Sequence, residues 1–217
     1  MKTAKLRVAG EVEAKTAQGA GRELTAGKWW AAALALVAFG ITMRLYFRDI
    51  PNFSPVAAVA LYAGFLFGGI RRSIWVPLAV MAASDWVIGG YDGKLMVVVY
   101  AMLALPVVWG SGISTWHRRG GRMSVIATCL LATVAGSFAF YFVTNSAVWA
   151  FSSWYSRDWS GWVECLAAGL PFFRYTLGGD LAFATALFGG HFAFVAVRQS
   201  LVARQRAAHA SHTVTLL

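Results

Sequence analysis

The chain has 217 residues, of which 59% are hydrophobic and only 13% are charged. Soluble domains carry roughly 25% charged residues, so this composition, with a mean hydropathy of +0.60, excludes an ordinary soluble protein and indicates a membrane protein. The net charge of +10 would suggest nucleic acid in a soluble chain, but the basic residues here stand at the ends of apolar segments. We therefore interpret them as topology signals and expect no nucleic-acid partner.

The first 28 residues mix acidic and basic side chains without apolar periodicity, which predicts a disordered tail over 1–28. Six apolar segments follow, and a bilayer core needs about 20 residues per helix. They lie at about 29–47, 54–70, 73–90, 95–115, 123–151 and 175–197. The sequence thus predicts an all-α bundle of six transmembrane helices over 29–197, followed by a C-terminal tail over 198–217.

Basic residues alternate between the connections of these segments. The first tail, the Arg71-Arg72 turn, the loop that ends at Arg122 and the last tail are strongly basic, whereas the other connections balance arginine or lysine with acidic residues. Positive charge is enriched in cytoplasmic connections. Both termini, and therefore both tails, are expected in the cytoplasm.

Under this topology, polar and ionisable residues in or beside the spans gather at the outer side. Such residues are costly in a bilayer and usually face the bundle interior, an opposite charge or a ligand. The candidate solute-binding residues are Asn52, Ser54, Asp85, Tyr100, Tyr141, Asn145, Trp149, Arg174 and Asp180.

The spacing of three candidates points to one face of the fifth helix. Tyr141, Asn145 and Trp149 are four residues apart, so a phenol, an amide and an indole share that face. They could stack on a flat ligand and orient it by hydrogen bonds. Arg174 would suit a carboxylate or phosphate.

Each candidate also has a structural explanation. Asp85 and Arg174 could form an ion pair that joins two spans, and Asn145 could make an interhelical hydrogen bond. The tryptophans of the fifth connection are typical of an interfacial aromatic belt.

Motifs for catalysis and for metal binding are absent from the sequence. No HExxH, paired-carboxylate motif or P-loop occurs, and Cys129 and Cys165 lack metal-ligand spacing. We expect neither enzymatic activity nor a cofactor or bound metal.

Four motifs together carry a resemblance. They are Pro-Asn-Phe-Ser-Pro-Val-Ala at 51–57, Ser-Asp-Trp at 84–86, Thr-Asn-Ser at 144–146 and Pro-Phe-Phe-Arg-Tyr-Thr-Leu-Gly-Gly-Asp at 171–180. Over residues 43–190 the chain resembles a family of uncharacterised bacterial six-span proteins labelled as transport proteins. That family is in turn distantly similar to the substrate-binding S components of energy-coupling-factor vitamin transporters.

The resemblance implies a multi-pass protein of the bacterial cytoplasmic (inner) membrane that binds a vitamin-sized solute near its outer face. S components are energised by a separate transmembrane coupling subunit with two ATPases. They often carry an AxxxA docking patch on the first span, and Ala31 and Ala35 have that spacing. Neither cysteine is placed as an axial cobalt ligand, so cobalamin is one candidate solute among several.

These observations predict a membrane uptake component for a small vitamin-like solute, energised by a separate ATPase module or acting as a facilitator. The alternative is a structural or accessory membrane subunit whose polar cluster locks the bundle and whose tails touch lipid. A third possibility, a small membrane enzyme, would need an acid and a base close together in the pocket.

Overall fold

A computed structural model describes residues 25–117 and 122–215 of the chain, and within these ranges it is helical with no strand. The predicted all-α class is confirmed. The helices are α2 Ala26–Tyr46, α3 Val56–Phe67, α4 Ile70–Ser73, α5 Trp75–Ile88, α6 Gly93–Ala104, α7 Pro106–His117, α8 Arg122–Phe151 and α9 Trp159–Thr215. The chain divides into two compact units, Met1–Ala32 and Ala33–Leu217. Most of the predicted tail over 1–28 lies outside the described residues.

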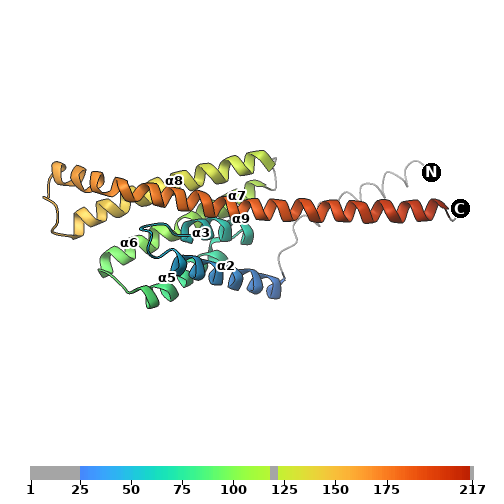
Figure 1. The fold of residues 1–217 in the computed structure, drawn as a ribbon, viewed down its shortest axis with the longest axis horizontal. Helices are drawn as coiled ribbons and strands as arrows, with labels where there is room; N and C mark the ends of the chain where they lie inside the picture. Colours follow the sequence, from blue (N-terminus) through green and yellow to red (C-terminus); the bar gives the residue numbers. More distant parts are fainter. Residues whose placement is uncertain (1–24, 118–121, 216–217) are drawn as a thin grey trace. The chain divides into compact units, whose positions relative to one another are not determined.

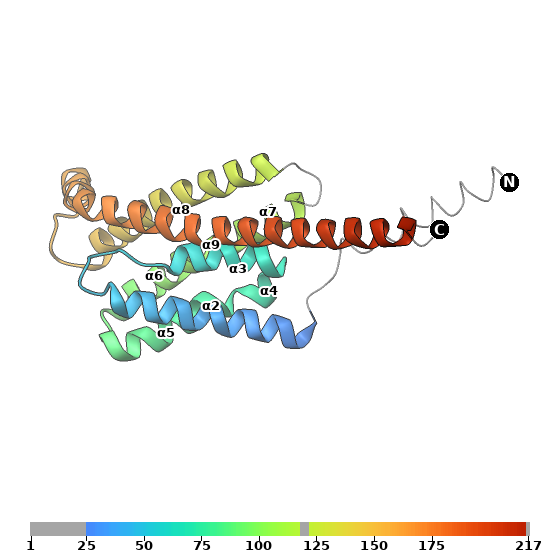
Figure 2. The same ribbon diagram turned by 45° about the vertical axis from the view of Figure 1, so that its right-hand side comes forward.

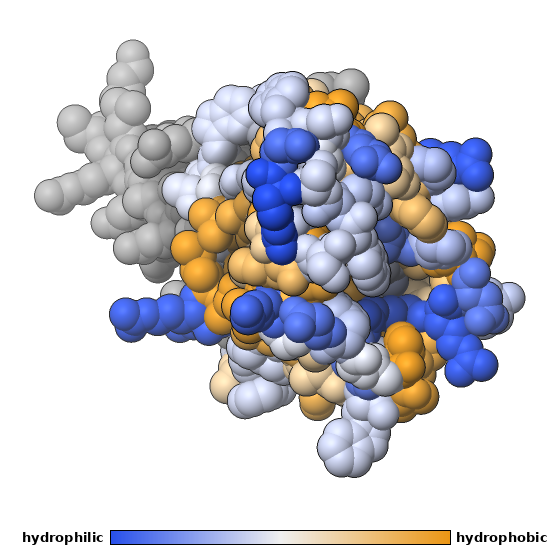
Figure 3. Space-filling model, turned by 90° about the vertical axis from the view of Figure 1, so that its left-hand side faces the viewer, coloured by the Kyte–Doolittle hydropathy of each residue, from blue (hydrophilic) through white to orange (hydrophobic). Residues whose placement is uncertain are grey.

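The helices of residues 33–217 run back and forth. Figure 2 shows α3 followed by α4 and α5 in the opposite direction, then α6 and α7, then α8, and finally α9. The connections 47–55, 89–92 and 152–158 meet at one end, which we call the loop end. Figure 3 looks at this end, where hydrophilic residues lie between hydrophobic flanks.

Within residues 25–117 and 122–215, four stretches of helix are long and apolar enough to cross a membrane. They are Ala26–Tyr46, Gly93–Trp116, Ser124–Phe151 and Trp159–Gln205. Large apolar side chains such as Leu131, Phe138 and Phe194 are exposed on them, at 69%, 56% and 67%. A soluble monomer rarely exposes so much apolar surface, so the structure indicates a membrane protein.

The predicted second and third segments are shorter helices in the structure. α3 has 12 residues and spans about 18 Å, less than a bilayer core of roughly 30 Å. It begins after Pro55 and ends at Gly68, whose φ of 66° is left-handed. α5 has 14 residues and ends at Gly89, with a φ of 101°. Glycine adopts these angles without the steric cost of a Cβ atom.

The predicted start of the last helix is wrong. Instead of a long connection up to Arg174, α9 begins at Trp159 and continues through Pro171 to Thr215. A proline inside a helix removes one backbone hydrogen bond and bends the axis without always ending the helix. Figures 1 and 2 show the first part of α9 at an angle to the rest. The predicted tail over 198–217 is helical as far as residue 215.

α3 lies at the centre of the packing. Eight of its 12 residues are buried, as expected for a helix that is apolar on all sides. Leu61 and Phe65 contribute to one core cluster with Phe188 of α9. Val59 contributes to a second, and Val56 to a third.

Two glycines allow α3 and α7 to touch through their backbones. A Cβ atom on Gly64 would collide with the carbonyl oxygen of Val107, and one on Gly110 with that of Leu61. Because backbone atoms cannot turn aside as side chains do, even a methyl group must push the helices apart.

Replacing Gly110 by alanine should therefore destabilise the protein by about 1–3 kcal/mol, the usual cost of overpacking. The matched control is Gly112→Ala on the same helix, where nothing lies within 4 Å. Unfolding of the detergent-purified variants measures the difference. Equal midpoints for the two variants would contradict this packing.

Candidate functional site

A buried carboxylate near the end of α5 anchors the first group of polar side chains. Oδ1 of Asp85 lies 2.6 Å from Nη1 of Arg44 on α2, and Oδ2 accepts a hydrogen bond of 2.8 Å from the hydroxyl of Tyr100 on α6. Nη1 of Arg44 also donates to Oγ of Ser84. We call Arg44, Ser84, Asp85 and Tyr100 the Asp85 cluster.

The Asp85 cluster is positioned by close packing one helical turn away. Gly40 lies four residues before Arg44, and a Cβ there would crowd the side chain of Val80, four residues before Ser84. The missing side chain lets α2 and α5 approach, so the next turns bring Arg44 and Ser84 together. Ser84 Oγ also donates to the carbonyl of Val80 at 2.6 Å, which orients the hydroxyl.

Burial makes this ion pair energetically expensive. The Asp85 and Arg44 side chains are 6% and 16% exposed, and apolar Val56, Val80 and Met81 form the adjoining core. Taking two charges out of water costs several kcal/mol per ion, and the pair repays this only with good geometry and further hydrogen bonds. Both oxygens of Asp85 are bonded, whereas Nε and Nη2 of Arg44 contact no hydrogen-bond partner among the described residues.

The charges of Asp85 and Arg44 also affect the pKa of Tyr91, which lies in the connection between α5 and α6. Burial raises the pKa of the Tyr91 phenol, the charge of Asp85 raises it further, and that of Arg44 opposes the rise. The phenol is 44% exposed. The loop end therefore carries a partly accessible aromatic ring within electrostatic reach of the Asp85 cluster.

A second buried carboxyl lies on α9. Asp180 is 4% exposed, and its Oδ2 forms a hydrogen bond of 2.6 Å with Oγ of Ser137 on α8. Gly179 helps to place it, because a Cβ there would lie only 3.3 Å from the backbone nitrogen of Ser54. α9 thereby approaches the chain just before α3 begins.

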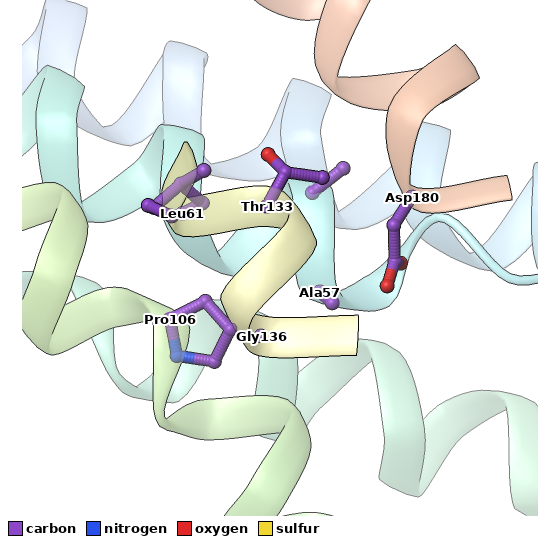
Figure 4. Close-up of a pocket in the computed structure, with 8 residues that line it drawn as sticks. Ala57, Leu61, Pro106, Thr133, Gly136 and Asp180 are labelled. Atoms are coloured by element: carbon purple, nitrogen blue, oxygen red, sulfur yellow. The ribbon is translucent and has the colours of Figure 1, made fainter. Parts of the chain in front are cut away.

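Asp180 borders a small cavity between α3, α7, α8 and α9, shown in Figure 4. Its volume is about 10 Å³, roughly the space one buried water molecule needs. The lining residues are Ala57, Ala58, Leu61, Pro106, Ala132, Thr133, Gly136 and Asp180. Apart from Thr133 and Asp180, these side chains offer no polar group.

The first turn of α3 lies beside both carboxyl groups. Val56 packs with Val80 and Met81 on the side of the Asp85 cluster, whereas the next residues, Ala57 and Ala58, line the cavity at Asp180. The structure therefore divides the predicted outer site into two polar groups.

Tyr141, Asn145 and Trp149 join α8 to the connection and helix that follow it. The Tyr141 hydroxyl donates to the carbonyl of Leu166 at 2.6 Å, and the Asn145 side chain lies against Gly169 while donating to the carbonyl of Tyr141 at 2.7 Å. Nε1 of Trp149 donates to the carbonyl of Ser156 at 2.8 Å. All three polar groups thus have partners within the protein.

Arg174 lies apart from both carboxyl groups. It is exposed, its guanidinium sits 4.7 Å from the centre of the Tyr175 ring, and Nη2 donates to the Tyr175 hydroxyl at 2.9 Å. The suggested Asp85–Arg174 ion pair is wrong, because Arg44 is the partner of Asp85.

The remaining predicted residues lie on the connection before α3 and on α2. Asn52 is exposed and left-handed, with a φ of 57°. Oγ of Ser54 accepts a hydrogen bond of 3.4 Å from the amide of Val56. Ala31 and Ala35 both lie on α2, and Ala35 is exposed.

Three residues of these groups, Arg44, Ser84 and Ser137, are missing from the sequence-based prediction. Arg44 is the only charged residue of the predicted first span, a signal that could have found it. Ser137 gives no such signal, because a single hydroxyl in an apolar helix usually bonds its own backbone.

The structure also describes the connection between α8 and α9. Asp158 accepts hydrogen bonds from the Gly161 amide and the Ser156 hydroxyl, both at 2.8 Å. These bonds hold the pKa of its carboxyl below the ordinary value. Arg157 donates to the carbonyl of Trp149 and, at 2.7 Å, to that of Ser152, so its guanidinium caps the end of α8.

Comparison with known proteins gives one match. The model of a family of unknown function (DUF6580) matches residues 24–204. Neither the curated proteins nor the solved structures include a match to this chain.

Removing one member of the Arg44–Asp85 pair should destabilise the protein by about 3–5 kcal/mol, because the other charge stays buried without a partner. We expect Arg44→Met and Asp85→Leu each to lower the unfolding midpoint strongly, and the double variant to recover much of the loss. Arg48→Gln is the control, because the Arg48–Asp49 pair is exposed. A double variant with the sum of the single losses would contradict direct coupling.

The lowered pKa of Asp158 predicts how the start of α9 responds to acid. Because the pKa of Asp158 is lowered in the folded state, its carboxylate stabilises this cap at pH values above the ordinary aspartate pKa of about 3.9. That contribution is lost as the pH falls through the lower folded value. NMR titration of Asp158 should give a midpoint below about 3.9, raised by Ser156→Ala and unchanged by Ser153→Ala. A wild-type midpoint at or above about 3.9 would contradict the cap.

Proposed function

We propose that this chain is a membrane uptake component that binds a small solute at the Asp85 cluster. The chain belongs to the family of unknown function (DUF6580). The observation that carries this proposal is the buried Arg44–Asp85 pair. In this pair, Nε and Nη2 of Arg44 contact no hydrogen-bond partner among the described residues. Charges of this kind inside membrane bundles are costly and commonly mark solute or ion pathways.

The chemistry of Arg44 defines the class of solute. Asp85 and Ser84 bind Nη1 and so fix the plane of the guanidinium. The remaining Nε–H and Nη2–H groups point in parallel and suit two acceptor oxygens, as a carboxylate presents. Tyr91 adds an aromatic ring at the same end, so a vitamin-like acid with a ring system fits this site.

The path of the chain supports six passes through a bacterial cytoplasmic membrane. In this topology α3 is the second pass, α4 with α5 is the third, and α6 with α7 is the fourth. Arg71 and Arg72 of α4 are exposed and follow α3 at the end opposite its first turn. Positive charge there favours a cytoplasmic location, which supports a topology with the loop end outside and both termini inside.

We expect the loop end to open when a solute binds. The connections 47–55 and 89–92 cover this end and would move apart to admit a solute to Arg44. Energy would come from a separate ATPase and coupling module docked near Ala31 and Ala35, or the protein would act as a facilitator.

A structural or accessory subunit is the second candidate function. It is favoured by the hydrogen bonds of Tyr141 and Trp149, which join α8 to the following segment without a ligand. In that case the Arg44–Asp85 pair only fastens α2 to α5.

A thermal-shift panel of vitamins and small carboxylic acids on the purified protein tests these alternatives. We expect one class of acid to raise the unfolding midpoint, and Arg44→Lys to weaken its binding about tenfold or more. Lysine keeps the charge but loses the planar fork. Arg174→Lys, at an exposed arginine away from the cluster, should bind like the wild type.

The absence of any stabilising acid, with a folded protein and a responsive control transporter, would overturn the uptake proposal in favour of the structural one. Equal weakening in Arg44→Lys and Arg174→Lys would place the binding site elsewhere.

A further inference from the structure

Asp180 differs from Asp85 in one decisive respect: no cation contacts it among the described residues. Asp85 has Arg44 at 2.6 Å. Within the described part of the chain, the single hydrogen-bond contact of the Asp180 carboxyl is Oγ of Ser137, at 2.6 Å from Oδ2. With an exposed fraction of 4%, this carboxyl is nearly as far from solvent as the apolar core around it.

An ionised carboxylate in such a site is unfavourable. Burying an unpaired charge costs several kcal/mol even after relaxation, and a buried group avoids that cost by becoming neutral. One hydroxyl hydrogen bond offsets only a small part of this cost. The carboxyl of Asp180 therefore needs a proton or another cation.

The contacts of Ser137 favour the proton. Its Oγ lies 3.0 Å from the carbonyl oxygen of Thr133 and 2.6 Å from Oδ2 of Asp180. A serine hydroxyl has a single hydrogen and cannot donate fully to both. If Asp180 is protonated, its O–H donates to Ser137 and the Ser137 O–H donates to Thr133, so each contact has its own hydrogen.

The cavity beside Asp180 argues against a metal cation. Hard cations take six or more oxygen ligands, and this cavity is lined by apolar side chains apart from Thr133 and Asp180. The Thr133 hydroxyl already donates to the carbonyl of Cys129 at 2.8 Å. The space of about 10 Å³ suits one water molecule, which could carry a proton to or from the carboxyl.

The other titratable groups of the surrounding helices either have hydrogen-bond partners of their own or lie at least one helical turn away from Asp180 and Ser137. On α8, the Tyr141 hydroxyl donates to the carbonyl of Leu166, and Cys129 lies about two helical turns before Ser137. On α3, the Tyr62 hydroxyl lies 3.0 Å from Nδ1 of His191 on α9. α2, α5 and α6 contribute the Asp85 cluster, whose charges bind each other.

We propose that Asp180 is a proton-binding site: its carboxyl holds an exchangeable proton at neutral pH, hydrogen-bonded to Ser137 and reached through the adjoining cavity. When the proton leaves, the Ser137 hydroxyl turns its hydrogen from Thr133 to the carboxylate. This site does not depend on the solute proposed for Arg44.

Infrared spectroscopy of the purified protein in lipid tests the site directly, because a protonated carboxyl has a carbonyl stretch separate from the carboxylate bands. We expect this band at neutral pH in the wild type, a shift of the band in D₂O, and its loss in Asp180→Asn. Asp49→Asn, at an exposed aspartate, should keep the band. Ser137→Ala should move its frequency, whereas Ser111→Ala on α7 should not.

Three results would overturn the proposal. The first is a wild-type protein without the band at neutral pH, and the second is a band that persists in Asp180→Asn. The third is loss of the band when sodium chloride replaces choline chloride, which would identify a metal-cation site. If Asp180→Asn does not fold, the Ser137→Ala variant decides, because an unchanged frequency excludes Asp180 as the source of the band.

Discussion

The structure depends on the burial of α3, a 12-residue apolar helix that packs against its neighbours on all sides. It can do so because Gly64 and Gly110 allow its backbone to touch that of α7. The same burial leaves little room for polar groups, so each carboxyl beside its first turn must be neutralised locally. Asp85 achieves this with Arg44 and Tyr100, and Asp180 has Ser137 and a water-sized cavity.

The two ways of neutralising a buried carboxyl suggest different roles for Asp85 and Asp180, which both lie beside α3. A fixed ion pair with unused guanidinium donors suits recognition of a solute with acceptor oxygens. A lone carboxyl with one hydroxyl partner suits the uptake and release of a proton. Because Val56 faces one group and Ala57 the other, a small displacement of the first turn of α3 would disturb both. That arrangement would allow the solute binding and the protonation proposed above to influence each other.

Much of the candidate site followed from the rule that intramembrane charges need partners, but the rule does not name the partners. It drew attention to Asp85 and Asp180, which are both buried. It paired Asp85 with the wrong arginine, because Arg174 lies on the exposed side of α9 whereas Arg44 faces α5. The regular spacing of Tyr141, Asn145 and Trp149 places them on one face of α8, but spacing does not reveal their hydrogen-bond partners. Tyr141 donates to α9 and Trp149 to the connection before it, whereas Asn145 donates to the carbonyl of Tyr141 on α8 itself.

The sequence by itself determined the helical class, the membrane composition and most of the turns, because each depends on the local run of apolar residues and on glycine, proline and charge at its ends. It did not determine that α9 continues through Pro171, since a proline bends one helix and ends another according to the packing around it. Only the tertiary structure decided which buried charges meet. Arg44 and Asp85 are about 40 positions apart, and their contact requires two helices to present the right faces at the right depth, which no local pattern specifies.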